Sequence, residues 1–175
     1  MLHALLEKAG ERPPYVLAGH SYGRMIARLY AMRFPAEVVG LVLIDSSHED
    51  QMRRFAAITP EVTPAATAAA TAMLPEDIDL AGMSAALAAE PWHARIPLVV
   101  LTRGRAAADT ASTMTLDRYA MWLDLHRELA TRAPGAEHLV VENSGHDIHN
   151  DQPAVVVEKI RQVAKGVGSL FRPRD

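Results

Sequence analysis

A serine between two glycines is the residue of this sequence best suited to covalent chemistry. Ser21 lies in the pentapeptide GHSYG (residues 19–23), which comes directly after an apolar run and directly before a helical pattern. A tight turn between a strand and a helix lifts a serine hydroxyl above the edge of a sheet, where it can act as a nucleophile. Gly19 and Gly23 are expected because a Cβ at either position would collide with the neighbouring backbone. The plainer alternative is a serine that only caps the helix, but the paired glycines favour the nucleophile.

His146 is the histidine best placed to act as general base for such a serine. An unperturbed imidazole titrates at about pH 6.5, so it can take the serine proton and return it to a leaving group near neutral pH. His146 ends a short loop after an apolar run, and Gly145 lets that loop fold over the edge of a sheet. His149 is the main rival, and the position of Gly145 favours His146.

Four apolar runs must position these residues. They predict strands near 14–18, 38–45, 96–102 and 138–142, and continuous apolar runs are typical of strands that are covered on both faces. Helical segments separate the runs, which predicts parallel βα units with right-handed crossovers. The expected fold class is therefore α/β, with a mostly parallel, doubly wound sheet.

The order of these elements resembles that of the α/β-hydrolase family, in which a serine follows one strand, an acid comes next and a histidine follows the last strand. The likeness runs from about Leu2 to the last predicted helix and is carried mainly by segments 15–45 and 144–149. It implies that Ser21 attacks the carbonyl of an ester, or of a related thioester or lactone, while His146 shuttles the proton. No cofactor is implied. A serine nucleophile argues against haloalkane and epoxide hydrolysis, for which this family uses an aspartate.

The resemblance offers two positions for the acid. Many members carry it a few residues after the strand that corresponds to 96–102, where this chain has alanines and then Asp109. Others carry it at the end of the strand after the serine unit, where this chain has Asp45. Asp45 is the preferred acid and Asp109 the alternative, although an aspartate in such a place is also common as a turn residue. Either would fix the imidazole tautomer and stabilise the imidazolium.

The resemblance also assigns the oxyanion hole in part. One donor is the backbone amide of Tyr22, the residue after the nucleophile. The family takes a second donor from an earlier loop, often His-Gly, and no such segment precedes Gly19. Loss of one donor typically costs about two to three decades in rate, so reduced activity is expected. Arg24 stands where the family has a small residue, and its side chain is expected to snorkel outward or to line the cleft.

Only one helical segment, 2–9, precedes the serine strand here, whereas several strands precede it in the family. The chain is therefore expected to be the C-terminal portion of such a hydrolase, with the serine strand as an exposed sheet edge. Such an edge must be covered or paired. The alternative function is thus a catalytically impaired binding or dimerisation module, for example a homodimer through that edge.

The segment 47–95 is expected to form a helical cap inserted within a single domain, 1–175. It is rich in Ala, Thr and Pro, and helical pieces are predicted over 51–57, 64–73 and 80–89. The resemblance implies a lid that excludes water and shapes the acyl pocket.

The cluster of His146, Asp147, His149 and Asp151 within six residues could suggest a metal site. The sequence has no HExxH or EF-hand spacing, and Asp151 is more simply a cap on the final helix. Neither a metal nor a cofactor is therefore expected.

Composition argues against several other classes of protein. The net charge of −3 and the pI of about 6.2 do not favour nucleic acid or anionic membranes as partners. The chain has no cysteine, so it forms no disulfide and no thiolate metal site. No apolar run is long enough to span a membrane. The start of the sequence is not a signal peptide, which makes the cytoplasm the default location, with an upstream signal left open.

Overall fold

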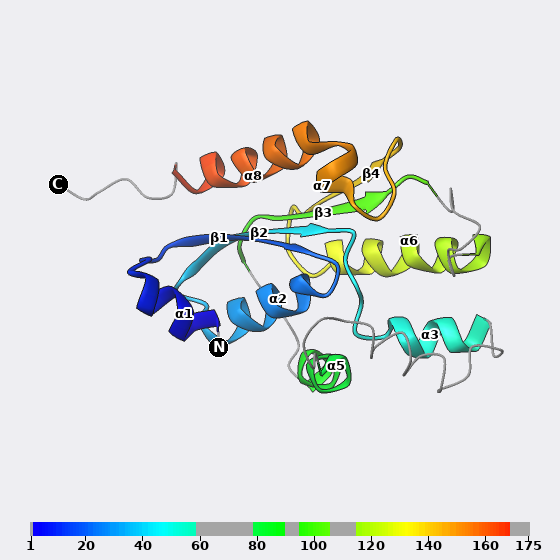
Figure 1. Cartoon of the computed structure of the whole chain (residues 1–175), viewed down its shortest axis with the longest axis horizontal. Helices are drawn as coiled ribbons and strands as arrows, with labels where there is room; N and C mark the ends of the chain where they lie inside the picture. The colour runs from blue at the N-terminus through cyan, green and yellow to red at the C-terminus, as the bar shows by residue number, and fades with distance from the viewer. Residues whose placement is uncertain (1, 59–78, 90–94, 106–114, 169–175) are drawn as a thin grey trace.

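Four strands form one parallel sheet, with strand order β1-β2-β3-β4 (Figure 1). The computed structural model describes residues 2–58, 79–89, 95–105 and 115–168 of the 175-residue chain. The strands are β1 (Tyr15–His20), β2 (Val38–Ile44), β3 (Leu98–Arg103) and β4 (Glu137–Val141). All four predicted strands are confirmed, with ends that differ by at most two residues.

Helices cover both faces of this sheet, as the prediction of a doubly wound α/β fold requires (Figure 1). On one face lie α1 (Leu2–Ala9), α2 (Gly23–Arg33) and α6 (Leu116–Ala130). On the other lies α8 (Pro153–Gly168), preceded by the single turn α7 (Ile148–Asp151). No helix in the described part of the chain has the length and apolar character needed to cross a membrane.

The core lies on both sides of the central strand β2. Its successive side chains point to opposite faces: Leu41 and Leu43 pack in the layer of α2 and α6, whereas Val42 and Ile44 pack in the layer of α8. All four are buried. A strand that is covered on both faces has no polar side, which is why the sequence of β2 is a continuous apolar run.

β1 pairs with β2 alone and forms one edge of the sheet that the structure describes. Val16 and Leu17 are only partly buried, and Ala18 is exposed. The strand that leads to Ser21 is therefore an edge strand, as expected from the sequence.

Two of the three helical pieces expected in the segment 47–95 are present. They are α3 (Gln51–Ile58), which contacts α6, and α5 (Leu80–Ala89), which contacts α2. The third, predicted over 64–73, lies outside the described residues. The role of this segment as a lid stays a prediction.

Candidate active site

Ser21 occupies a sharp turn between the end of β1 and the start of α2. Its φ is +54°, in the left-handed region that residues with a side chain rarely adopt. Two backbone hydrogen bonds hold it there: its amide donates to the Ile44 carbonyl at 3.1 Å, and the Ser47 amide donates to its carbonyl at 3.3 Å. A non-glycine residue in this conformation costs roughly 1–2 kcal/mol and persists where surrounding structure enforces it.

The two glycines beside Ser21 have different reasons to be there. A Cβ at Gly19 would lie 2.7 Å from the Cα and the backbone nitrogen of Arg24, so the close crossing of strand and helix excludes any side chain. A Cβ at Gly23 would meet nothing within 4 Å. The expectation of a backbone collision is thus right for Gly19 and wrong for Gly23, since a Cβ on the first residue of α2 would point into open space.

The backbone amide of Tyr22 lies at the N-terminus of α2. The Tyr22 carbonyl already accepts from the Met25 amide at 2.8 Å, but no hydrogen bond from the Tyr22 amide is formed within the described residues. Free amides at this end of a helix, together with the helix dipole, favour negative charge.

Asp45 and His146 are brought together at the carboxyl ends of β2 and β4. Asp45 follows β2 directly, is fully buried and has a φ of +38°. Its Oδ2 accepts a hydrogen bond of 2.6 Å from Nδ1 of His146. This bond fixes the proton on Nδ1 and leaves Nε2 as the basic nitrogen. The alternative acid, Asp109, lies outside the described residues.

Three further hydrogen bonds and an ion pair hold the Asp45 carboxylate. Its Oδ1 accepts from the indole of Trp122 at 2.9 Å and from the backbone amide of Arg103 at 3.0 Å. Its Oδ2 accepts from Nε of Arg103 at 2.7 Å and pairs with Nη2 at 2.6 Å. Burial raises the pKa of Asp45, but the His146 hydrogen bond and the charge of Arg103 outweigh it and lower the pKa to about 2. The carboxylate is therefore ionised at neutral pH.

Sequence reasoning missed Arg103 and Trp122, which both contact the Asp45 carboxylate. Besides its bonds to Asp45, Arg103 has its Nη2 2.9 Å from Nδ1 of His146 and its guanidinium 5.3 Å from the ring centre of Trp122. The sequence held one usable clue: Arg103 follows a predicted strand, and parallel strands end at the same edge of a sheet. Trp122, in the middle of α6, had no such clue.

His20 links the serine turn to the loop that carries His146. Its Nε2 lies 3.0 Å from the backbone carbonyl of His146, to which it donates, and the two imidazole rings are 4.5 Å apart. Burial, followed by the neighbouring His146, lowers the pKa of His20, which suits a neutral ring that donates from Nε2. The side chain of His146 is 38% exposed. No hydrogen bond joins it to Ser21 in the described part of the chain.

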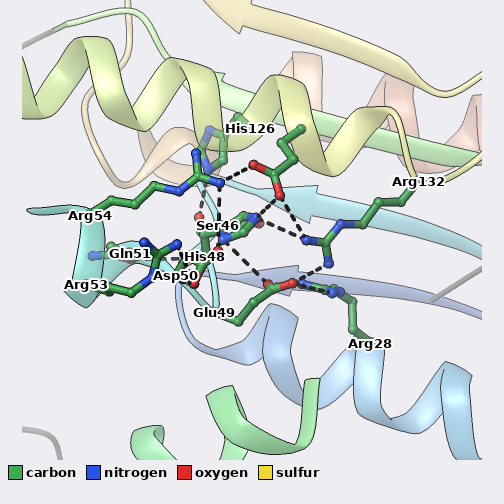
Figure 2. A network of polar contacts seen from close by, with 11 residues as sticks. Arg28, Ser46, His48, Glu49, Asp50, Gln51, Arg53, Arg54, His126 and Arg132 are labelled. Atoms are coloured by element: carbon green, nitrogen blue, oxygen red, sulfur yellow. Dashed lines mark hydrogen bonds and ion pairs between the residues drawn. The ribbon is translucent and has the colours of Figure 1, made fainter. Parts of the chain in front are cut away.

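A buried polar network braces the loop after β2 against α2 and α6 (Figure 2). Glu49 lies at its centre, where it accepts from Arg28 at 2.7 and 3.2 Å and also from Arg132. On the other side, Nε2 of His126 donates to the backbone carbonyl of Ser46 at 2.7 Å. Because a bidentate ion pair is directional, these contacts fix the course of the loop that begins at Asp45.

The side chain of Arg24 is not where the sequence placed it. It was expected to reach solvent or to line the cleft, but it is fully buried. Among the residues that the structure describes, its three guanidinium nitrogens have no hydrogen-bond partner. Burial, followed by the neighbouring charge of Arg28, lowers the pKa of Arg24 well below its usual value. The expectation for Arg24 is therefore wrong, because α2 packs closely on β1 at this point and this side of its first turn is buried.

The residues weighed for a metal are arranged differently from the sequence cluster. His146 is bonded to Asp45, and Oδ2 of Asp151 accepts from the Gly145 amide at 2.7 Å, so Asp151 braces the loop before His146. This contact differs from the helix cap that was predicted. Asp147 and His149 instead lie with His20, and ligand atoms of these three residues are all within 4.8 Å of one another.

Comparisons with known proteins agree with the fold described above. The model of the alpha/beta hydrolase fold family matches residues 1–73. The chain has the α/β-hydrolase fold. Est816, described as an N-acyl homoserine lactone degrading enzyme, is 20% identical with a TM-score of 0.56, over 92% of this chain and 71% of its own. The carboxylesterase CesB (YbfK) from Bacillus subtilis is 18% identical with a TM-score of 0.57, over 94% of this chain and 64% of its own.

A curated relative of this α/β-hydrolase-fold chain is the uncharacterized protein YqjL of Bacillus subtilis. The two are 28% identical over 156 residues, which are 89% of this chain. The match spans only 58% of the length of YqjL.

Proposed function

We propose that this chain provides the catalytic groups of a serine hydrolase that cleaves a carboxylic ester or a related acyl bond. The observation that carries the proposal is the 2.6 Å hydrogen bond from His146 to the buried, ionised Asp45, on a loop that His20 ties to the Ser21 turn. A histidine bonded to a buried aspartate is the half of a catalytic triad that orients the base, and the proposal adds the other half, in which Ser21 donates its proton to Nε2 of His146.

In the proposed reaction, Oγ of Ser21 attacks the ester carbonyl carbon while Nε2 of His146 takes the hydroxyl proton. The carbonyl π electrons move to oxygen, and the amide of Tyr22 donates to the resulting oxyanion. The oxyanion then collapses, and His146 returns the proton to the departing alkoxide. A water molecule, deprotonated by His146, attacks the acyl-serine in the same way and releases the acid. Asp45 keeps the imidazole in the productive tautomer throughout.

The substrate class follows from the same chemistry and from the relatives. Acyl transfer through a serine suits esters, thioesters and lactones. Est816 is described as degrading an N-acyl homoserine lactone, and CesB is described as a carboxylesterase. A small-molecule ester or lactone is therefore the substrate to test first.

A second candidate function rests on the edge strand β1. Its outer side has no neighbour within the described sheet, and unpaired strand edges readily accept another strand. The domain would then act as a binding module, for instance as a homodimer through β1. The single described oxyanion donor favours this alternative, since one missing donor typically costs about 10²–10³ in rate.

Labelling with a fluorophosphonate separates the two. Wild type and Ser47→Ala, a change in a neighbouring serine, are expected to react covalently, whereas Ser21→Ala and His146→Gln are not. Circular dichroism checks that each variant is folded. Folded wild type that fails to react would refute the hydrolase, and light scattering would then test the dimer.

A further inference from the structure

We propose that His20, Asp147 and His149 form a binding site for one divalent ion of the zinc class, next to the Ser21 turn. This proposal goes beyond acyl transfer, which requires no metal. It concerns a set of three residues that the fold assembles from two distant segments: His20 ends β1, whereas Asp147 and His149 lie in and after the loop that carries His146.

The geometry is close to that of a bound ion. The ligand atoms of the three side chains are all within 4.8 Å of one another, and Nε2 of His20 is 3.7 Å from Oδ1 of Asp147. The rings of His20 and His149 are 4.6 Å apart. Zinc bonds of about 2.1 Å in a tetrahedron hold ligand atoms roughly 3.4 Å apart. Since the ligand atoms are now within 4.8 Å of one another, a contraction of up to about 1.4 Å closes the site.

That contraction needs little rearrangement. The side chain of Asp147 is 58% exposed, and His149 is also exposed, so both can turn without disturbing the core. His20 is the fixed member, because it is partly buried between the rings of His146 and His149. Two mobile ligands around one fixed ligand can adapt to the ion.

The donor set selects the class of ion. Two imidazole nitrogens and one carboxylate suit zinc and similar transition metals, whereas magnesium and calcium prefer oxygen ligands alone. Three protein ligands leave the fourth tetrahedral position for water or another small ligand. The neighbouring candidates are engaged elsewhere: Nδ1 of His146 on Asp45, and Asp151 on the Gly145 amide.

Metal binding would act on the neighbouring serine turn. Nε2 of His20 now lies 3.0 Å from the His146 carbonyl, and an ion bound through this nitrogen would replace its proton and that hydrogen bond. The ion would cross-link the residue before Ser21 to the residue after His146. We therefore expect zinc to slow the reaction of Ser21, and this second readout alone rests on the proposed hydrolase.

The test measures zinc binding to the full chain by isothermal titration calorimetry after removal of metals. We expect one Zn²⁺ per chain, no binding of Mg²⁺ or Ca²⁺, and at least tenfold weaker zinc binding in His149→Ala and in Asp147→Asn. His3→Ala, which removes a histidine on α1, is the matched control and should bind zinc as wild type does.

Three results would overturn the site: no zinc binding at a 1:1 ratio, unchanged affinity in His149→Ala, or an equal loss in His3→Ala. The second readout is the rate of fluorophosphonate labelling with and without zinc. Zinc binding in a chain that never reacts with the probe would leave the metal site standing and refute only the hydrolase.

Discussion

Replacing Asp45 by asparagine tests both the proposed chemistry and the reasoning about charge. The indole of Trp122 and the backbone amide of Arg103 both donate to Oδ1, so the asparagine must keep its oxygen at that position. Its NH₂ group is then forced into the place of Oδ2, where it faces Nδ1 of His146 and the guanidinium of Arg103. Two donors cannot bond to each other, so His146 must shift its proton to Nε2 and can no longer act as the base.

The expected effects on rate and stability follow from this arrangement. A triad with the wrong imidazole tautomer typically loses about 10⁴ in rate, or roughly 5.5 kcal/mol of transition-state stabilisation. A carboxyl pKa of about 2 in the folded state, against 3.8 as the ordinary value, corresponds to about 2.4 kcal/mol of stability at neutral pH. The folded pKa is the lower one, so this stability is present above about pH 4 and is lost as the pH falls towards 2. The free energy of unfolding of Asp45→Asn at pH 7 should therefore be lower than that of wild type by about 2–4 kcal/mol. In this variant the stability that wild type loses as the pH falls from about 4 towards 2 should already be missing.

The assay compares second-order rates of fluorophosphonate labelling and urea unfolding at pH 7 for Asp45→Asn, Asp109→Asn and the control Asp124→Asn. Asp124 is exposed on α6 and bonds only to Arg127 within the described residues. The reasoning is refuted if folded Asp45→Asn reacts with the fluorophosphonate at a second-order rate within tenfold of the wild-type rate. A large loss in Asp109→Asn instead would assign the acid to the alternative position.

Three further predictions concern the elements around this site. Gly19→Ala should abolish labelling and stable folding, because its Cβ would lie 2.7 Å from backbone atoms. Gly23→Ala should keep labelling and should raise the free energy of urea unfolding by about 0.5–1 kcal/mol, because its Cβ would meet open space. Equal losses of stability in the two variants would contradict the open space at Gly23. Arg24→Met should be neutral or stabilising, because the Arg24 guanidinium has no acceptor among the described residues. Arg28→Met should lower the free energy of unfolding by about 3–5 kcal/mol, because it breaks the pair with Glu49. A larger loss in Arg24→Met than in Arg28→Met in thermal unfolding would contradict this order. Burial lowers the pKa of His126 to about 3, so below pH 6.5 the unfolded chain binds one more proton than the folded chain. The free energy of unfolding should therefore fall by about 1.4 kcal/mol per pH unit from pH 6 down to pH 4. A free energy of urea unfolding that stays constant over this range would contradict this prediction.

Local features of the sequence were sufficient to predict the serine turn, the four strands and most helices. An apolar run of six or seven residues, a glycine where backbones cross and a helical pattern all act over a few residues, so each leaves its mark in a short window. The prediction of a backbone collision at Gly23 was nevertheless wrong. Whether a Cβ collides depends on the direction in which the backbone projects it, which a residue type does not report.

The partners of the reactive groups depended on tertiary structure. His146 meets Asp45 across 101 positions of the chain, and His20 meets the His146 carbonyl across 126. Such contacts depend on strand order and register, which pair Ile44 with Leu101 and Arg103 with Val141. Strand order and register are set by the burial of whole sheet faces, and no short stretch of the sequence contains both residues of such a contact. The sequence therefore suggested which residues could react, and only the packed sheet decided that Asp45 bonds to His146, that Arg103 pairs with the same carboxylate and that Arg24 is buried.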